Sequence, residues 1–323
     1  MEIKLTELSN KEKAMFALRA LYASHGFSMF RMSKFEAFDL YADNRDFMDY
    51  ASIITFTDTD GMLMALKPDV TLSIVKNNRN IGDDIRKIYY NENVYRVSPR
   101  TRYFKEIMQV GVECLGKVDD DCICEVLLLA AESLSILSKD AVLDISNLDI
   151  LSQLIASYRV PREAEEKIAE EIGKKNIHGL AQVCRDYDIG PARCELLKML
   201  ITTYGKPEEV IPKLETAFAK AEGAEEYMAS LGRLKKIVKA FRGSGFENML
   251  NLDFSVVSDL KYYNGIFFKG FVKGVPDGVL SGGQYDKLMK NMNRNSKAIG
   301  FAVYMDNLGR LSRFEGEEVV IRG

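Results

Sequence analysis

Apolar residues recur at three- and four-residue spacing in the first part of the chain, from Lys11 to Ser24. This period predicts an amphipathic helix. His25 and Gly26 should end it, because glycine readily adopts the backbone conformation of a helix C-terminus. The same spacing predicts a second helix from Cys122 to Ser138.

Shorter runs rich in β-branched and apolar residues predict strands. The run from Ala51 to Leu66 has Asp-Thr-Asp-Gly at its centre, which predicts a hairpin with its turn near Asp60-Gly61. Lys67-Pro68-Asp69 then breaks the extended chain. A helix should follow over 70–78, with the carboxylate of Asp69 near its positive end.

A second hairpin is expected farther along the chain. Its strands are Ile85 to Tyr95 and Ile107 to Leu115, joined by the basic segment Arg96 to Glu106. A short strand is expected from Val142 to Ile145.

The pattern changes to helices with long charged runs between residues 148 and 245, and strand-like segments then return. These are Leu250 to Val257, Ile266 to Val272 and, as a closing strand or helix, Ile299 to Leu311. Strands and helices do not alternate regularly, so the sequence predicts an α+β fold whose largely antiparallel sheet is flanked by helices. We expect three segments: a core in two parts, 1–147 and 246–323, and a helical insertion at 148–245.

Composition narrows the function. The chain has 323 residues, 47% of them hydrophobic, and a net charge of -3, which disfavours non-specific binding of nucleic acid. With no bilayer-length apolar stretch and no signal-peptide pattern, we expect a cytoplasmic protein.

The five cysteines are scattered and odd in number, which indicates reduced thiols. The spacing Cys122-Ile-Cys124 is not typical of zinc ligands, so no metal and no cofactor is expected.

Common catalytic signatures are missing from the sequence. It contains no phosphate-binding glycine loop, no serine elbow and no paired-histidine metal helix. The two histidines, His25 and His178, are expected at the surface or at helix ends. No catalytic residue is therefore predicted.

One set of polar residues has the chemistry of an amino-acid site. Gln109 and Glu113 lie four apart on one strand and face the same side, and Gly111 between them should leave space for a small ligand. A carboxylate can bind the ammonium or imidazole group of an amino acid, and an arginine can bind its carboxylate. Tyrosine side chains can pack on both sides of a ring. Spacing alone favours the ordinary alternative, in which Glu113 and Asp69 are solvated or salt-bridged acids and the tyrosines pack a sheet edge.

Several segments, taken together and in order, resemble class II histidyl-tRNA synthetases. They are LKPDVT (66–71), IYYNENVYR followed by FKEIMQVGVECLG, then LKYYNGIFFKGF, SGGQYDKL and AIGFAVYMDNL. The resemblance covers approximately residues 35 to 311. It implies a class II synthetase-like core with a helical insertion.

Carried over position by position, the resemblance implies a retained histidine pocket and lost catalytic groups. The implied histidine-binding residues are Asp69, Thr71, Arg96, Gln109, Glu113, Tyr262 and Tyr263. The lost catalytic positions are Ser98, Ser258, Lys261, Gln284 and Asn307. Adenylation needs cations against phosphates and developing negative charge, so the loss of several should abolish it.

This pattern is similar to the family of ATP phosphoribosyltransferase regulatory subunits, which lack the anticodon-binding domain. The resemblance implies a non-catalytic subunit for the first step of histidine biosynthesis. Its implied partners are L-histidine as effector and the short-form catalytic subunit, with a homodimer inside a hetero-octamer. Two alternatives stay open: an active histidine-activating ligase or synthetase fragment, and a synthetase-like scaffold for another ligand or RNA.

The sequence also departs from the family pattern. The N-terminus lacks the P-x-G-x-x-D segment, motif 1 near residues 35–41 lacks its proline, and Asp69 is shorter than the family's glutamate by one methylene. These departures bear on dimer geometry and on histidine affinity.

Overall fold

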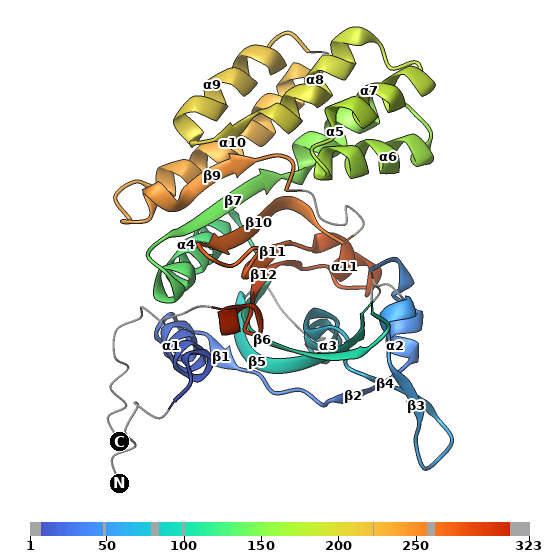
Figure 1. Cartoon of the computed structure of the whole chain (residues 1–323), viewed down its shortest axis with the longest axis vertical. Coiled ribbons are helices and arrows are strands. Elements are labelled where there is room, and N and C mark those ends of the chain that lie inside the picture. Colours follow the sequence, from blue (N-terminus) through green and yellow to red (C-terminus); the bar gives the residue numbers. More distant parts are fainter. Residues whose placement is uncertain are drawn as a thin grey trace. The chain divides into compact units, whose positions relative to one another are not determined.

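The computed structural model describes residues 8–47, 50–78, 84–98, 101–221, 223–256 and 262–310, without the side chains of Asp46, Tyr50 and Arg310. The chain divides into two compact units (Figure 1). The first unit is Met1–Ala141 with Gly270–Gly323, and the second is Val142–Lys269. The segment boundaries expected after residues 147 and 245 stay predictions.

The first unit is built on five strands in the order β1-β5-β6-β12-β11. They are β1 (Ser28–Met29), β5 (Arg86–Val97), β6 (Phe104–Gly116), β12 (Lys297–Tyr304) and β11 (Leu280–Gln284). Only β1 and β5 are parallel among the pairs described for this unit; β5, β6, β12 and β11 pair antiparallel. The largely antiparallel sheet is therefore confirmed, although the glycine-containing strand β11 was not predicted.

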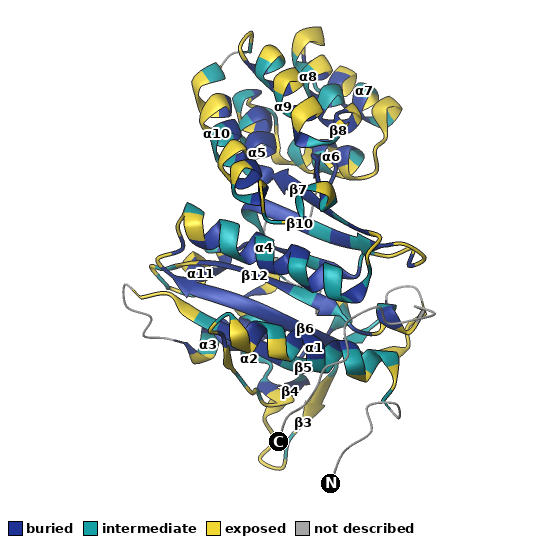
Figure 2. Ribbon diagram, turned by 90° about the vertical axis from the view of Figure 1, so that its left-hand side faces the viewer, coloured by how far each residue is buried: buried dark blue, intermediate teal, exposed yellow. Residues whose placement is uncertain are grey.

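Helices α1 (Asn10–Ser24) and α4 (Asp120–Leu137) cover one face of this sheet (Figure 2). Tyr22 of α1 packs its ring 6.4 Å from that of Tyr89 and 5.9 Å from that of Phe301, and its hydroxyl accepts a hydrogen bond from Ser133 of α4. The α1 prediction is confirmed: Ser9 caps the start, and Gly26 has a φ of +79° after the end. The other face carries α3 (Val70–Asn77) and α11 (Asp286–Asn291) (Figure 1).

A small second sheet precedes α3, with the order β2-β4-β3. Its strands are β2 (Phe35–Ala37), β3 (Thr55–Thr57) and β4 (Leu63–Leu66), and α2 (Asp39–Ala42) follows β2. The hairpin turn expected near Asp60-Gly61 is confirmed, because Gly61 has a φ of +82°. The strand begins later than predicted, since Tyr50–Ser52 is a 3-10 turn.

The β5–β6 hairpin is longer than the sequence predicts. Arg96 pairs with Lys105 and Val97 with Phe104, so the expected loop of 96–106 shrinks to 98–103. Alternating polar residues at the hairpin end tolerate solvent on both faces, which allows the ladder to continue. Tyr103 and Phe104 at the tip are 76% and 72% exposed.

The second unit contains the helices of the expected insertion. They are α5 (Leu148–Ser157), α6 (Arg162–Gly173), α7 (Ile177–Asp186), α8 (Pro191–Thr202), α9 (Pro207–Phe218) and α10 (Ala224–Phe241). The unit also holds β7 (Ala141–Asn147) from Val142 onward, β8 (Tyr204–Gly205), β9 (Leu250–Asp253) and the start of β10 (Asn264–Val272). Parallel pairing of β7 with β9 brings the two ends of the helical region together.

Two strand predictions in the C-terminal part need correction. Within 250–256 the strand ends at Asp253, because the carboxylate of Asp253 accepts hydrogen bonds from the backbone N–H and hydroxyl of Ser255 and turns the chain. Val257 lies outside the described residues. The segment 299–311 is a strand to Tyr304 and then a 3-10 turn, Asn307–Arg310. Leu311 lies outside the described residues.

The described part of the chain has no helix long and apolar enough to cross a membrane. The cysteines are free thiols, four of them buried and Cys124 half-buried. No three His, Cys, Asp or Glu side chains in the described ranges are arranged to hold a metal ion.

Candidate functional site

Glu113, in the middle of β6, is the centre of a buried polar cluster. Glu113 is 2% exposed. One carboxyl oxygen is 3.0 Å from the hydroxyl of Thr71 on α3, and the other is 2.7 Å from the hydroxyl of Tyr285. We call Glu113, Thr71 and Tyr285 the Glu113 cluster.

The protonation of Glu113 follows from its surroundings. Burial raises the pKa of the carboxyl to about 8, more than the hydroxyls of Tyr285 and Thr71 lower it, and the negative charge of Asp69 raises it further. In the described part of the chain Glu113 forms no ion pair. A neutral carboxyl at pH 7 can both donate and accept a hydrogen bond.

Gly300 on β12 makes room for Glu113. The two residues are directly opposite in the β6–β12 register, and a Cβ at position 300 would lie 1.8 Å from a carboxyl oxygen of Glu113. Gly283 is in turn opposite Gly300 on β11. The absence of side chains on both strands thus leaves space for the carboxyl group.

Asp69 and Arg96 lie beside the cluster at the start of α3. Asp69 caps the helix, accepting a hydrogen bond from the backbone N–H of Leu72 at 2.9 Å. The guanidinium of Arg96 donates to the carbonyl of Pro68 at 2.7 Å and lies 3.7 Å from the second oxygen of Asp69. Arg96 is 40% exposed, so its guanidinium can also meet a ligand carboxylate.

The expected open space above Gly111 is not present. A Cβ at Gly111 would meet the hydroxyl of Tyr90 at 2.5 Å and the carbonyl of Phe301 at 2.3 Å. Tyr90 is directly opposite Gly111 on β5, so its side chain occupies this part of the sheet face. Gln109, two residues before Gly111, is 6% exposed.

Sequence reasoning missed two residues of this region, Lys67 and Tyr285. Lys67 is completely buried and its ammonium lies 2.7 Å from the carboxylate of Glu92, which is opposite Gln109 in the β5–β6 register. Tyr285 stands inside the SGGQYDKL segment, where a tyrosine next to a glycine-rich strand was the available signal. No comparable signal pointed to Lys67, because a lysine is ordinarily expected at the protein surface.

Tyr262 and Tyr263 belong to the second unit, so the Glu113 cluster is built from first-unit residues alone. The two tyrosine rings are 4.5 Å apart, and that of Tyr263 is 4.8 Å from the ring of Phe267. Tyr262 is buried and Tyr263 is half-buried.

At the positions expected to have lost catalytic groups, the described side chains are buried or form hydrogen bonds within the fold. Ser98 is buried and its hydroxyl accepts from the backbone of Thr101 at 3.4 Å. Asn307 donates to the carbonyl of Gly278 at 2.9 Å, and Gln284 is buried at the end of β11. Ser258 and Lys261 lie outside the described residues.

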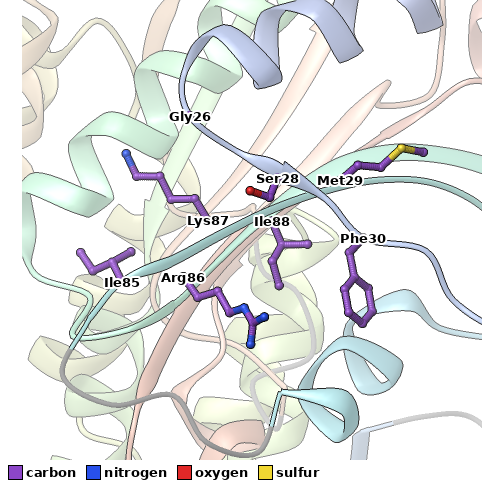
Figure 3. A pocket seen from close by; sticks show the side chains of 8 residues that line it. All are labelled: Gly26, Ser28, Met29, Phe30, Ile85, Arg86, Lys87 and Ile88. Atoms are coloured by element: carbon purple, nitrogen blue, oxygen red, sulfur yellow. The ribbon is translucent and has the colours of Figure 1, made fainter.

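A separate pocket of about 360 Å³ lies where β1 meets the start of β5 (Figure 3). It is lined by Gly26, Ser28, Met29, Phe30, Ile85, Arg86, Lys87 and Ile88. The ammonium of Lys87 is already paired with Glu125 at 2.5 Å. None of the residues predicted to bind histidine lines this pocket.

Comparison with known proteins agrees with the motifs. A histidyl-tRNA synthetase family model matches residues 2–308. The ATP phosphoribosyltransferase regulatory subunit of Caldanaerobacter subterraneus subsp. tengcongensis is 30% identical over 296 residues, which cover 90% of this chain and 75% of the relative.

Two solved structures have the same fold. An ATP phosphoribosyltransferase regulatory subunit/histidyl-tRNA synthetase from Bacillus halodurans has a TM-score of 0.79 at 20% identity, covering 94% of this chain and 79% of that one. A chain of the ATP phosphoribosyltransferase (HisG:HisZ) complex from Thermotoga maritima has a TM-score of 0.69 at 18% identity, covering 91% and 97%. The predicted class II synthetase-like fold is confirmed, and the chain belongs to the histidyl-tRNA synthetase-like family of ATP phosphoribosyltransferase regulatory subunits.

Proposed function

We propose that this chain binds free histidine at the Glu113 cluster and passes the signal to the short-form catalytic subunit of ATP phosphoribosyltransferase. In this proposal the chain does no chemistry of its own. It acts in the first step of histidine biosynthesis, in the cytoplasm, as a homodimer within a hetero-octamer. The relatives' regulatory role and the retained polar residues support it.

The observation that carries the proposal is that Glu113 has no cationic partner among the residues that the structure describes. This acid is buried with two hydroxyl partners and burial raises its pKa to about 8. An ammonium or imidazolium brought by a ligand would supply the positive charge that stabilises the ionised form. Histidine carries both groups, which makes this acid a suitable anchor for it.

Arg96 is suited to the other end of the same ligand. Its guanidinium is 40% exposed and its ion pair with Asp69 is loose, at 3.7 Å. A ligand carboxylate would form a shorter, two-pronged contact with a guanidinium. One acid and one arginine thus supply opposite charges for the two charged ends of an α-amino acid.

Regulation requires that histidine bind two states of the assembly unequally. A ligand shifts a conformational equilibrium only by its differential affinity for the two states. In this proposal the state of the subunit that holds histidine is the one in which the catalytic subunit is inhibited.

Isothermal titration calorimetry with histidine tests the proposal, on the full chain alone and on its complex with the catalytic subunit. We expect binding by the wild type and at least tenfold weaker binding by Glu113→Gln, because one charge-assisted hydrogen bond contributes roughly 1.5–3 kcal/mol. Lys11→Met is the control, since it removes a surface ion pair with Asp306.

Two outcomes would contradict the proposal. One is a lack of heat on adding histidine together with a catalytic subunit that histidine does not inhibit. The other is histidine-dependent exchange of pyrophosphate into ATP by the purified chain, which would instead support an active ligase.

A further inference from the structure

Strand β6 changes from exposed to buried along its length. Its first three residues, from Phe104 to Glu106, are exposed, whereas the eight residues from Gln109 to Gly116 are buried. Thr101 to Tyr103, just before the strand, are exposed as well. The start of β6 and the turn before it therefore project beyond the packed part of the sheet, and we call residues 101–106 the hairpin tip.

Backbone hydrogen bonds fix the shape of the hairpin tip. The N–H of Ser98 donates to the carbonyl of Tyr103 at 2.9 Å, and the carbonyl of Ser98 accepts from the N–H of Arg102 at 2.8 Å. Val97 then pairs with Phe104 in the β5–β6 register. The exposed side chains are thus carried by a defined backbone, which lowers the entropic cost of ordering them against a partner.

Two neighbouring aromatic residues dominate the hairpin tip. Tyr103 is 76% exposed and Phe104 is 72% exposed, more than any other large apolar side chain in the described part of the chain. A single exposed apolar residue is ordinary on a protein surface, but adjacent rings exposed to this extent are not. Aromatic side chains are enriched at the centres of protein interfaces, where they contribute most of the binding energy. The hairpin tip therefore has the composition of an interface.

The face of the hairpin turned away from Phe104 is cationic. Arg96 and Lys105 are directly opposite each other in the β5–β6 register. Like charges at opposed positions of an antiparallel pair destabilise it. Lys105 and Arg102 form no ion pair with any acid that the structure describes. An anionic group brought to this face would offset the repulsion.

The acid of the hairpin tip has other partners. Glu106 points to the face opposite Lys105, because successive side chains of a strand alternate between faces. One of its oxygens accepts from the amide of Asn93 at 2.5 Å and from the hydroxyl of Tyr95 at 3.0 Å. The hairpin tip thus presents aromatic rings together with positive charge.

Rings beside cations suit either a nucleic acid or an acidic protein surface, and the charges favour the protein. Affinity for nucleic acid comes largely from the number of phosphates that cations neutralise. The hairpin tip supplies Arg102 and Lys105, while the whole chain has a net charge of -3. A protein interface needs only a few charges that match those of its partner, around a buried apolar centre.

We propose that the hairpin tip docks into an acidic, partly apolar hollow on the catalytic subunit of ATP phosphoribosyltransferase. This inference rests on the proposed function, which supplies that partner. The rings of Tyr103 and Phe104 fill the hollow, and Arg102 and Lys105 pair with acids at its rim. The partner thereby contacts the same strand that carries Glu113, the proposed anchor for histidine.

Binding of the full chain to the purified catalytic subunit, measured by biolayer interferometry, tests the proposal. The double variant Tyr103→Ala and Phe104→Ala should bind at least about tenfold more weakly, because buried aromatic residues carry much of the energy of an interface. Circular dichroism and urea unfolding should show that the double variant is folded.

Charge variants test the cationic part of the hairpin tip. Arg102→Glu should lower the association rate about tenfold at low salt and less at high salt, because salt screens exposed charges. Arg102 has a φ of +58°, a conformation that glycine adopts easily. Arg102→Gly therefore removes the charge without backbone strain, and it should show a smaller loss in the same direction.

Matched controls carry similar changes elsewhere on the surface. Ile177→Ala on α7 shortens an apolar side chain of a residue that is 38% exposed. Lys220→Glu reverses an exposed charge two residues after the end of α9. Neither variant should change the affinity for the catalytic subunit.

A cross-linking experiment reports on the contact without relying on a loss of affinity. With p-benzoylphenylalanine in place of Tyr103, irradiation of the complex should join the chain to a catalytic-subunit peptide rich in Asp or Glu. Mass spectrometry of the digested product identifies that peptide.

The outcomes separate this inference from the proposed function. Folded hairpin-tip variants that bind the catalytic subunit as tightly as the wild type would overturn the docking site alone, as would a complex without a cross-link from position 103. A wild type that does not associate with the catalytic subunit would overturn both proposals. Retarded migration of transfer RNA by the wild type but not by the double variant, with equal binding of the catalytic subunit, would identify RNA as the occupant instead.

Discussion

Glu113 and Asp253 are both buried acids at strand positions, one in each unit, yet their partners differ. Asp253 has a lysine of its own, with 2.9 Å between carboxylate and ammonium. Glu113 has two hydroxyls, and burial raises its pKa to about 8. Their side chains are almost equally hidden from solvent, at 4% and 2% exposure of the residue.

The difference distinguishes an acid that stabilises the fold from an acid that can still pair with a cation. A buried carboxylate with its own ammonium is electrostatically complete, and removing the partner leaves an uncompensated charge. A buried carboxyl with only hydroxyl partners stays neutral at little electrostatic cost and can still gain a cation from outside. On this comparison Asp253 supports the fold, and Glu113 is the acid that we propose as the anchor for a ligand.

The largest expected effect on stability comes from Glu92, which like Asp253 is paired with a lysine. Lys67→Met removes the completely buried ammonium beside Glu92, whose side chain is 15% exposed. We expect a loss of about 3 kcal/mol in the free energy of unfolding, because an unpaired buried charge remains. Urea denaturation measures it.

Thr71→Val provides the contrast, since it removes one hydroxyl partner of Glu113. We expect this variant to lose about 1 kcal/mol in the free energy of unfolding. Equal losses for Lys67→Met and Thr71→Val would mean that the two kinds of acid do not differ as described.

Gly300→Ala should have the next largest effect, because it fills the space that Glu113 uses. The new Cβ would lie 1.8 Å from a carboxyl oxygen of Glu113 and 2.4 Å from the carbonyl of Val112. We expect a loss of about 2 kcal/mol in unfolding free energy together with loss of histidine binding. Thermal denaturation and calorimetry measure the two effects.

The control is Gly232→Ala on α10, where a Cβ would meet nothing within 4 Å. Alanine should stabilise this helix by up to about 1 kcal/mol. A Gly300→Ala variant as stable as the wild type would show that Glu113 is not confined by β12.

The smallest expected effect is a change in pH dependence. The pKa of Glu113 in the folded chain, about 8, is above the ordinary 4.5, so the folded state binds more protons between these values. This contribution to stability is complete below pH 4.5 and is lost as pH rises through 8. Between pH 6 and 7, wild-type stability relative to Glu113→Gln should fall by about 1 kcal/mol.

Unfolding by urea at several pH values checks this, with Glu195→Gln as control because Glu195 is exposed. Parallel pH profiles for wild type and Glu113→Gln would refute the raised pKa of Glu113. A histidine affinity that rises with pH toward 8 would support a cationic group of the ligand at this acid.

Periodicity predicted the elements well where local contacts decide them. The helix from Lys11 and the helix after Asp69 begin and end at capping residues that are visible in the sequence. The strand from Leu250 was predicted too long, because a carboxylate that turns the chain at Asp253 looks like any polar residue in a strand.

The site was predicted less completely, since its contacts are distant along the chain. Thr71 and Glu113 do meet, as the motif resemblance implied, but Tyr285 is 172 residues from Glu113 and its role could not be read from spacing. The alternation that placed Gly111 on the face of Glu113 was right about direction. It could not show that Tyr90 from the next strand fills the space.

The pairing of β6 with β12 has a consequence for newly made protein. Tyr285 is translated 172 residues after Glu113, and Gly300 later still, so the whole helical region emerges in between. At roughly 5–20 residues per second this is a delay of roughly 10 to 35 seconds. A ribosome-bound chain therefore carries Glu113 without Tyr285, one of its two hydroxyl partners, and the complete Glu113 cluster forms only after the helical region has been translated.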